Sequence, residues 1–518
     1  MTMREGWDDA PPAVAAYRAA LPPGELEGLR IDALDRVAVP TYHLTYWPAH
    51  GPMNGANGYG ATLDAAMTSA FGELTEVVAA HEALGRMPRR AGSYRELVED
   101  VGPRGVLDPL TACLEAGSAY TPARPLHWVE ARRLSTGEPV LVPLEWAACQ
   151  TSNIGAGDWL ITPITNGLGA GLSRAQALCH GLLELVQRDG NNVSFRAMDR
   201  GVLVELDGVE DATTRALLER LDRVGVDLQV KLASTDFGIP NLYVVGRDRT
   251  DGAPGVCIAP IAGAACGEAA DPDRERALRK ALLEFAAARA RKAFTHGPLD
   301  RVEEITPPGY LDPFRRGSLA DEEPRALETM RAWTRLDHAQ LRALLDETVF
   351  AVRERVAFSA LPTTPASEMD DAARLRLIVA RLGADGLDDI LYLDYSPASG
   401  RTGVHAVKVI VPGLDVETMS YNRIGERTVR RLLDRGSPLV GVGAPPSSAR
   451  CIPLTPAAER RLGGPAWLDV ERVAATVGPL YPLYREPGRH SAPLAEERCA
   501  PAGSAGALPA DGGERVGK

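Results

Sequence analysis

Three segments of this chain share one helix pattern, and this repetition constrains the fold more than any other feature. Each segment begins at a polar residue that can cap a helix, and an alanine follows four positions later. The three caps are Thr62, Ser173 and Asp273. A carboxylate follows eleven positions after each cap, at Glu73, Glu184 and Glu284. Apolar side chains form the opposite stripe, so one face of each helix can be buried.

The polar faces of these helices carry more than isolated glutamates. Fourteen positions after the cap, the first helix has Glu76 and the second has Gln187. An exposed glutamate is a good helix former and needs no further reason, which is the ordinary interpretation of any one helix. Small residues, however, flank Glu73 and Glu76, and they suit the approach of a ligand. Carboxylates spaced i, i+3 share a face, and such oxygen ligands suit Mg²⁺ bound to phosphate.

Strands are expected between the helices. The sequence predicts them at 39–48, 128–134, 139–146, 227–234, 241–248, 255–263, 388–396 and 405–414. Glycine-rich turns are expected at 53–60 and before Ser173, and further helices at 326–347 and 370–386. The fold class is therefore mixed α/β (α+β), with approximate internal repeats of strand, turn and helix around one cleft that would hold metal and phosphate.

The length of 518 residues predicts more than one substructure. We expect an N-terminal lead-in at 1–40, a core at 41–300, an inserted or peripheral helical segment at 301–370, and the rest of the core at 371–484. Residues 485–518 are rich in Pro, Gly and Ala and are expected to be disordered, with few contacts from 488 onward. Deleting this tail should leave folding intact.

Composition excludes some classes of protein. The net charge of −12 argues against nucleic acid as a partner, because phosphate contacts need clustered Lys and Arg. The sequence contains no uninterrupted apolar run of membrane-spanning length and no signal-peptide core at its start, which favours a cytoplasmic protein. Its seven cysteines are widely spaced without a Cys-x-x-Cys pair, so neither a zinc site nor a disulfide framework is expected.

Five motifs, in this order, give the chain a resemblance to the YcaO family over roughly residues 50–440. They are Ser69-x3-Glu73-x2-Glu76, Asn166-Gly167-x3-Gly171, Glu184-x2-Gln187-Arg188-Asp189, Ala281-Leu282-x-Glu284 and Val407–Leu414. The resemblance implies an ATP- and Mg²⁺-dependent enzyme that activates a backbone amide of a ribosomally made precursor peptide. The products would be thioamides, amidines or azolines.

The resemblance also assigns roles to residues. Its metal ligands would be Glu73, Glu76, Glu184, Gln187 and Glu284. Its nucleotide-binding residues would be Ser69, Gln176, Arg188 and Lys280, with Arg276 and Arg291 on the same helix face as Lys280. The residue that performs the chemistry is not assigned.

Several positions depart from the family pattern. Val77 replaces an arginine, Tyr59 replaces a lysine, and Gln176 and Gln187 replace carboxylates. If both glutamines face Mg²⁺-ATP, changing them to glutamate should tighten nucleotide binding. The chain also lacks the Pro-x-Pro-x-Pro tail of azoline-forming members, which favours thioamide or amidine formation.

Two other functions stay open. One is a degenerate family member that binds a precursor peptide or partner enzyme without turning over ATP. The other is an unrelated ATP-dependent ligase. Because no peptide-delivery domain is recognised before the core, we expect a separate helper protein; a homodimer is compatible with the sequence.

Overall fold

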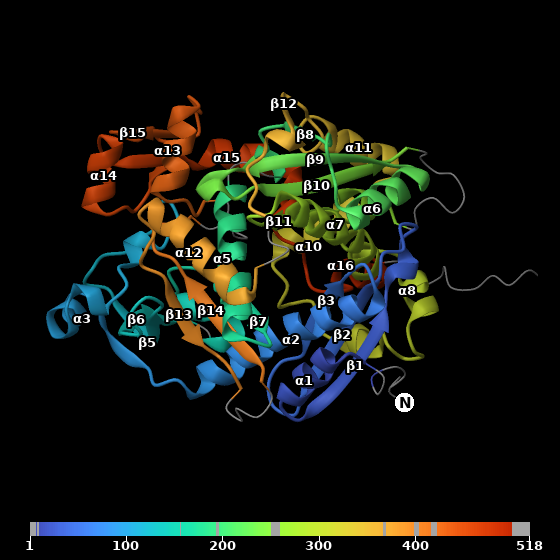
Figure 1. Ribbon diagram of the computed structural model, residues 1–518, viewed down its shortest axis with the longest axis horizontal. Helices are drawn as coiled ribbons and strands as arrows, with labels where there is room; N and C mark the ends of the chain where they lie inside the picture. The colour runs from blue at the N-terminus through green and yellow to red at the C-terminus, as the bar shows by residue number, and fades with distance from the viewer. Residues whose placement is uncertain are drawn as a thin grey trace, which may run out of the picture.

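The computed structural model describes residues 7, 10–155, 157–192, 196–249, 259–365, 369–397, 403–415 and 422–499. Within these ranges the chain forms four sheets and a set of helices (Figure 1). Helices α2, α5 and α7 form a central group. Around them lie the sheet of β1–β3, the part of a second sheet that contains β8–β10, and the part of a third sheet that contains β5 and β14. This mixed α/β arrangement confirms the fold class expected from the sequence.

The sheets are mostly antiparallel. The first has the order β1-β2-β3, with β1 at Gly24–Arg30, β2 at Thr41–Pro48 and β3 at Asn54–Tyr59. The second has the order β11-β10-β9-β8-β12: β8 Val202–Glu205, β9 Val226–Ser234, β10 Asn241–Asp248, β11 Cys266–Ala270 and β12 Glu354–Ala357. In this sheet β12 runs parallel to β8. The third has the order β4-β5-β13-β14-β7, with β6 beside β5: β4 Arg90–Ser93, β5 Pro125–Arg133, β6 Pro139–Pro143, β7 Leu168–Gly171, β13 Leu391–Asp394 and β14 His405–Ile410. The fourth has the order β15-β17-β16: β15 Val440–Val442, β16 Ala449–Cys451 and β17 Ala466–Asp469.

The three helices that carry the repeated pattern are long. They are α2 (Leu63–Arg86), α5 (Arg174–Asn191) and α7 (Arg274–His296). The others are α1 Pro12–Ala20, α3 Tyr94–Val101, α4 Leu144–Ala147, α6 Ala212–Arg223, α8 Leu299–Ile305, α9 Asp312–Arg316, α10 Pro324–Thr334, α11 His338–Asp346, α12 Asp371–Ala384, α13 Glu426–Asp434, α14 Pro456–Leu462, α15 Val470–Val477 and α16 Ser491–Cys499. No helix in the described ranges is long and apolar enough to cross a membrane.

The three expected caps are present. The side chains of Thr62, Ser173 and Asp273 each accept a hydrogen bond from a backbone N–H in the first turn of the following helix. Each long helix follows a strand (β3, β7 or β11) and packs closely on it. A Cβ on the strand glycine Gly58, Gly169 or Gly267 would lie about 2.1 Å or less from the nearest backbone atom of the helix. The small residues of the helices therefore permit this strand contact, and Ala66 and Ala80 are fully buried.

The three strand–helix units also contact one another in a ring. Helix α2 contacts β7 of the second unit, α5 contacts β11 of the third, and α7 contacts β3 of the first. Side chains make the same connections. Glu76 of α2 accepts from Ala170 N of β7, Gln187 of α5 donates to Glu268 of β11, and Tyr59 of β3 donates to Glu284 of α7. The repeat seen in the sequence is thus a cyclic arrangement in space.

Some sequence predictions are wrong in detail. The glycine-rich stretch at 53–60 is mostly strand β3, because glycine allows the close contact with α2. Of the strand predicted at 255–263, residues 255–258 lie outside the described ranges, and Pro260–Ala264 form a 3₁₀ helix. The helix predicted at 326–347 is two helices, because Asp337 and Gln340 form a capping box that starts α11.

The ends of the chain differ more strongly from expectation. Within the predicted lead-in, residues 24–30 form strand β1 of the first sheet. The prediction of a disordered tail is wrong for residues 485–499, which include helix α16. Contacts with a distant part of the chain hold this segment in place, since Glu486 pairs with Arg291, Lys292 and His296 of α7. Residues 500–518 lie outside the described ranges.

Candidate functional site

Carboxylates of α2 and α5 accept hydrogen bonds from backbone N–H groups in or next to β3 and β7. Glu73 Oε2 accepts from Asn57 N at 2.9 Å, and Glu76 Oε1 accepts from Ala170 N at 2.9 Å. Glu184 Oε2 accepts from Gly167 N at 3.0 Å. Glu73, Glu76 and Glu184 therefore face strand backbone inside the ring and do not point to different sides of the molecular surface.

The third helix, α7, is connected to the cluster by Tyr59 of β3. In the sequence, this tyrosine is only a departure from the family pattern. The Tyr59 hydroxyl donates to Glu284 Oε2 at 3.0 Å. Burial raises the pKa of Tyr59 well above its usual value, and Glu284, Glu73 and Glu268 raise it further. The phenol therefore stays protonated and donates to Glu284.

Glu268, on β11, is the main site residue that the sequence reasoning missed. It accepts hydrogen bonds from Gln187 Nε2 at 3.0 Å, from Arg188 at 3.1 Å and from Asn191. Gln187 thus faces Glu268, which supplies a carboxylate where the helix itself carries an amide. The available signal was position, since Glu268 lies in the strand just before the third cap.

The cluster is electrostatically crowded. Burial raises the pKa of Glu73 to about 7, and the charge of Glu184 raises it too. Burial, Glu184 and Glu73 raise the pKa of Glu76 well above its usual value. Burial and Glu268 raise the pKa of Glu284 to about 7. Such groups lack sufficient positive charge around them in the ligand-free protein.

One ammonium reaches most of these carboxylates. Lys280 lowers the pKa of Glu73, Glu76 and Glu284 against the effects of burial, so these three groups lie within electrostatic reach of a single cation. Lys280 therefore lies beside the carboxylate cluster. Its effect on all three pKa values also shows that the carboxylates of α2 and α7 converge.

A basic group adjoins the cluster near the start of α7. Arg276 and Arg374 both pair with Asp271, which lies between β11 and α7. Burial, Lys280 and Arg374 lower the pKa of His180 to about 3, so this imidazole is neutral at physiological pH. The carboxylates therefore border a region of positive charge contributed by α7 and α12.

The remaining expected residues are placed less decisively. Ser69 lies on α2 one turn before Glu73 and is partly buried. Gln176 is exposed, and its carbonyl accepts from Leu172 N at 2.8 Å at the start of α5. Arg188 bridges Glu268 and Glu184. Among the described residues, no three His, Cys, Asp or Glu side chains surround a common point as ligands of one ion would.

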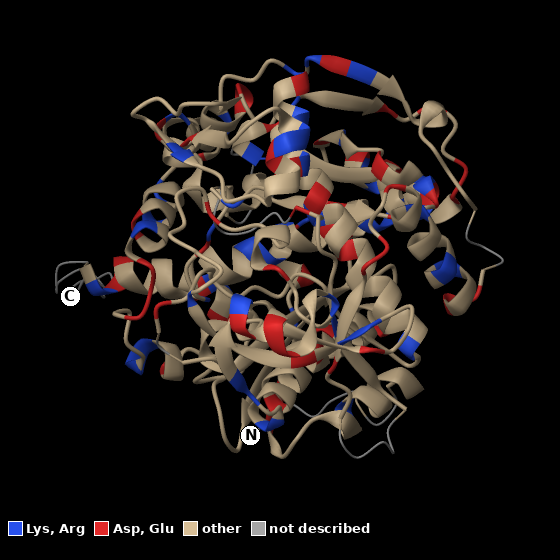
Figure 2. Cartoon of the chain, turned by 90° about the vertical axis from the view of Figure 1, so that its left-hand side faces the viewer, with Lys and Arg blue, Asp and Glu red and all other residues tan. Residues whose placement is uncertain are grey.

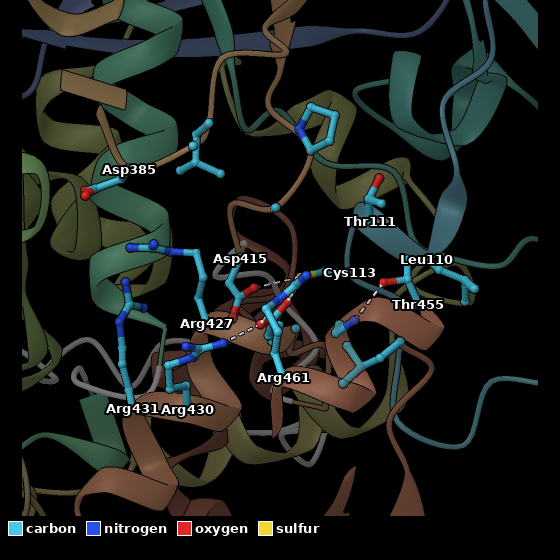
Figure 3. A pocket seen from close by; sticks show the side chains of 18 of the residues that line it. Leu110, Thr111, Cys113, Asp385, Asp415, Arg427, Arg430, Arg431, Thr455 and Arg461 are labelled. Atoms are coloured by element: carbon cyan, nitrogen blue, oxygen red, sulfur yellow. Dashed lines mark hydrogen bonds and ion pairs between the residues drawn. The ribbon is translucent and has the colours of Figure 1, made fainter. Parts of the chain in front are cut away.

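A separate pocket of about 670 Å³ lies where the core meets α13 and α14. Arg427, Arg430, Arg431 and Arg461 extend into it (Figure 3). Arg427 and Arg431 pair with the buried Asp189, the residue after Arg188. This junction fixes the end of α5 on the side opposite Glu268.

Comparison with known proteins identifies the family. Residues 57–415 match the family model described as YcaO cyclodehydratase, ATP- and Mg²⁺-binding. The match spans more than half of the chain and includes all three long helices, α2, α5 and α7. The chain therefore belongs to the YcaO family, whose members are ATP- and Mg²⁺-dependent enzymes that modify peptide backbones.

Two relatives match most of the chain. The chain is 27% identical over 406 residues to an uncharacterized protein of Methanothermobacter thermautotrophicus, covering 77% of this chain and 91% of the relative. It is 25% identical over 417 residues to an uncharacterized protein in the tfuA 3′ region of Rhizobium leguminosarum bv. trifolii, covering 78% and 86%.

Solved structures share the fold. A heterocyclase in complex with substrate and cofactor aligns with a TM-score of 0.58 at 17% identity, covering 82% of this chain and 54% of that protein. This chain thus spans about half the length of that heterocyclase. YcaO from Methanopyrus kandleri, bound with AMPPCP and Mg²⁺, aligns with a TM-score of 0.50 at 22% identity, covering 79% and 91%.

Proposed function

We propose that this chain binds Mg²⁺-ATP at the carboxylate cluster and activates a backbone amide of a ribosomally made precursor peptide. The observation that carries the proposal is the crowding of Glu73, Glu76 and Glu284, whose pKa values are raised by burial first and by neighbouring carboxylates as well. A cation relieves this crowding. Mg²⁺ is usually held by one or two carboxylates together with phosphate oxygens, so it does not require a complete cage of protein ligands, and the described part of the chain forms none.

The proposed chemistry assigns roles to residues of this chain. ATP would supply a phosphoryl group to the amide oxygen of the peptide. Glu73 and Glu184 would turn from the N–H groups of Asn57 and Gly167 to hold the cation. Arg188 and Lys280 would bind phosphate oxygens, and most of the rate enhancement would come from positioning and charge neutralisation.

The substrate and partner belong to the same proposal. The aligned heterocyclase was solved with a substrate and cofactor, which supports a peptide substrate for this fold. We assign this chain a precursor peptide and a helper protein that delivers it. Thioamide, amidine and azoline formation remain the candidate reactions, with the first two favoured by the sequence of the tail. In the Figure 2 view, Lys and Arg are scattered among Asp and Glu, which fits a protein partner better than nucleic acid.

Nucleotide titration tests the proposal. We expect AMPPCP to bind in a Mg²⁺-dependent way by calorimetry, and Glu73→Gln and Glu184→Gln to weaken this binding at least tenfold. The exposed control Glu99→Gln should bind as the wild type does. A wild type without Mg²⁺-dependent affinity would overturn the enzymatic function. Mass spectrometry of a candidate peptide incubated with ATP would then separate loss of water from exchange of oxygen for sulfur.

A second candidate is a scaffold that binds a precursor peptide or partner enzyme without ATP turnover. Its support is that Gln176 and Gln187 are both engaged in hydrogen bonds within the protein. Glu268 weakens this support, because it restores a carboxylate beside Gln187. The scaffold function predicts peptide binding that Mg²⁺ and nucleotide leave unchanged.

A further inference from the structure

The strands β3, β7 and β11 each lie at the end of a sheet, and backbone N–H groups of β3 and β7 bind carboxylates of the cluster. An edge strand presents unpaired N–H and C=O groups that can pair with another chain. All residues of β7 are buried, and so are those of β11 except the partly buried Cys266. On β3, Gly55 is exposed, and Asn57 and Tyr59 are partly exposed. The edge of β3 is thus the accessible one of the three.

The register of β3 shows which groups face outward. Residues of antiparallel strands alternate between pairs that exchange both backbone hydrogen bonds and pairs that exchange none. Asn57, opposite His43, is of the second kind, because its N–H binds Glu73. By alternation, Gly55 and Tyr59 also direct their N–H and C=O groups away from β2. Among the residues the structure describes, no strand pairs with this edge.

Glu73 marks a place for a further strand. Its Oε2 lies 2.9 Å from Asn57 N, where the carbonyl oxygen of a neighbouring strand would lie. Beside it, Gly55 has no side chain, and a Cβ there would meet only ordinary contacts at 3.6 Å or more. The same edge ends at Tyr59, whose hydroxyl binds Glu284. An extended chain on this edge would bring its own backbone amides to the carboxylate cluster.

We infer that the outer edge of β3 binds the main chain of the peptide substrate as an additional strand. This inference rests on the proposed function and locates its substrate. Main-chain pairing explains how an enzyme that acts on a backbone amide can hold it independently of side chains. Glu73 then has two exclusive partners, the Asn57 N–H and the cation. When Glu73 moves to the cation, it frees Asn57 N–H for the peptide, so nucleotide and peptide promote each other's binding.

A short acetylated and amidated peptide of alternating threonine and valine serves as the probe, with one N-methyl group introduced at each position in turn. Fluorescence titration should show that N-methylation weakens binding at least tenfold at every second position and leaves the others unchanged. A strand pairs through alternate residues, so this pattern is specific to it. Uniform effects along the peptide would overturn the inference.

Variants of Gly55 test the same edge from the protein side. Gly55→Pro removes an outward N–H and should weaken probe binding at least tenfold, whereas Gly55→Ala keeps that N–H and should bind as the wild type does. Equal affinity of the two variants would refute edge pairing. Mg²⁺-AMPPCP affinity and thermal unfolding of Gly55→Pro should match the wild type, which shows that the variant is folded.

Mg²⁺ and AMPPCP should tighten probe binding about tenfold in the wild type. If the wild type binds no nucleotide but the alternating pattern remains, the proposed enzyme fails while the binding edge stands. If nucleotide binds and the pattern is absent, the edge inference fails while the nucleotide site stands.

Discussion

Replacing Glu284 by glutamine should stabilise the ligand-free protein at alkaline pH. Burial and the charge of Glu268 raise the pKa of Glu284 from 4.5 to about 7 in the folded state. Because the folded-state value is the higher one, ionisation costs folding free energy as pH rises from about 4.5 to 7, and the full cost persists above pH 7. This cost is at most about 3 kcal/mol. Glutamine removes the charge, and its carbonyl can still accept from the Tyr59 hydroxyl.

Thermal unfolding between pH 5 and pH 8 measures this effect. For a chain of this length, about 3 kcal/mol corresponds to roughly 3 °C in melting temperature. We expect Glu284→Gln to melt about 3 °C higher than the wild type at pH 8, with the difference vanishing toward pH 5, where the wild-type carboxyl is protonated. Mg²⁺ with AMPPCP should raise the wild type more than the variant. A variant less stable than the wild type at pH 8 would refute the argument, and Glu99→Gln should show no pH-dependent difference.

Three further variants probe contacts away from Glu284. Gln187→Glu sets a second carboxylate against Glu268, so urea denaturation should show a loss of about 2–4 kcal/mol, with no tightening of nucleotide binding in calorimetry. Glu486→Gln leaves Lys292 partly uncompensated and should cost about 3–5 kcal/mol at pH 7. Although burial alone would raise the pKa of Glu486, Lys292 holds that pKa well below its usual value. The difference in unfolding free energy between the wild type and Glu486→Gln should therefore shrink as pH falls below about 4.5. Burial lowers the pKa of His490 to about 3, so the wild type should lose about 1.4 kcal/mol per pH unit from this group below pH 6.5, and His490→Gln should show a flatter profile.

The features predicted well from the sequence depend on neighbours along the chain. A cap such as Ser173 bonds to an N–H three residues away, and the spacing between cap and glutamate is fixed by the helix itself. The cyclic packing then brings these glutamates together without any further signal. Local pattern was therefore sufficient to identify α2, α5, α7 and most of the carboxylates.

The features that were missed depend on distant partners. From the sequence, Gln187 is interpreted as the replacement of a carboxylate that binds metal. Its hydrogen-bond partner Glu268 cannot be inferred from the local pattern, because it lies 81 residues away in the sequence. The expectation that glutamate at this position would tighten nucleotide binding is accordingly replaced by an expected loss of stability. The Pro-, Gly- and Ala-rich composition likewise predicts disorder for residues 485–499. A few specific side-chain contacts fix this segment in spite of that composition. Glu486 binds three side chains of α7, and His490 binds Tyr310.

The ring of strand–helix units connects stability with function. Its carboxylates include Glu73, Glu76 and Glu284, whose pKa values are raised by burial and, in addition, by the charges of neighbouring carboxylates. Each unit packs its strand glycine against its own helix and is joined to another unit by a side-chain hydrogen bond. The carboxylates that repel one another therefore cannot easily move apart. Binding of a divalent cation with nucleotide should therefore stabilise the whole ring. Loss of the charge of Glu73, Glu76 or Glu284 should raise the melting temperature of the free protein while reducing the further increase caused by Mg²⁺ and AMPPCP, because both effects originate in the cost of ionising these buried carboxylates.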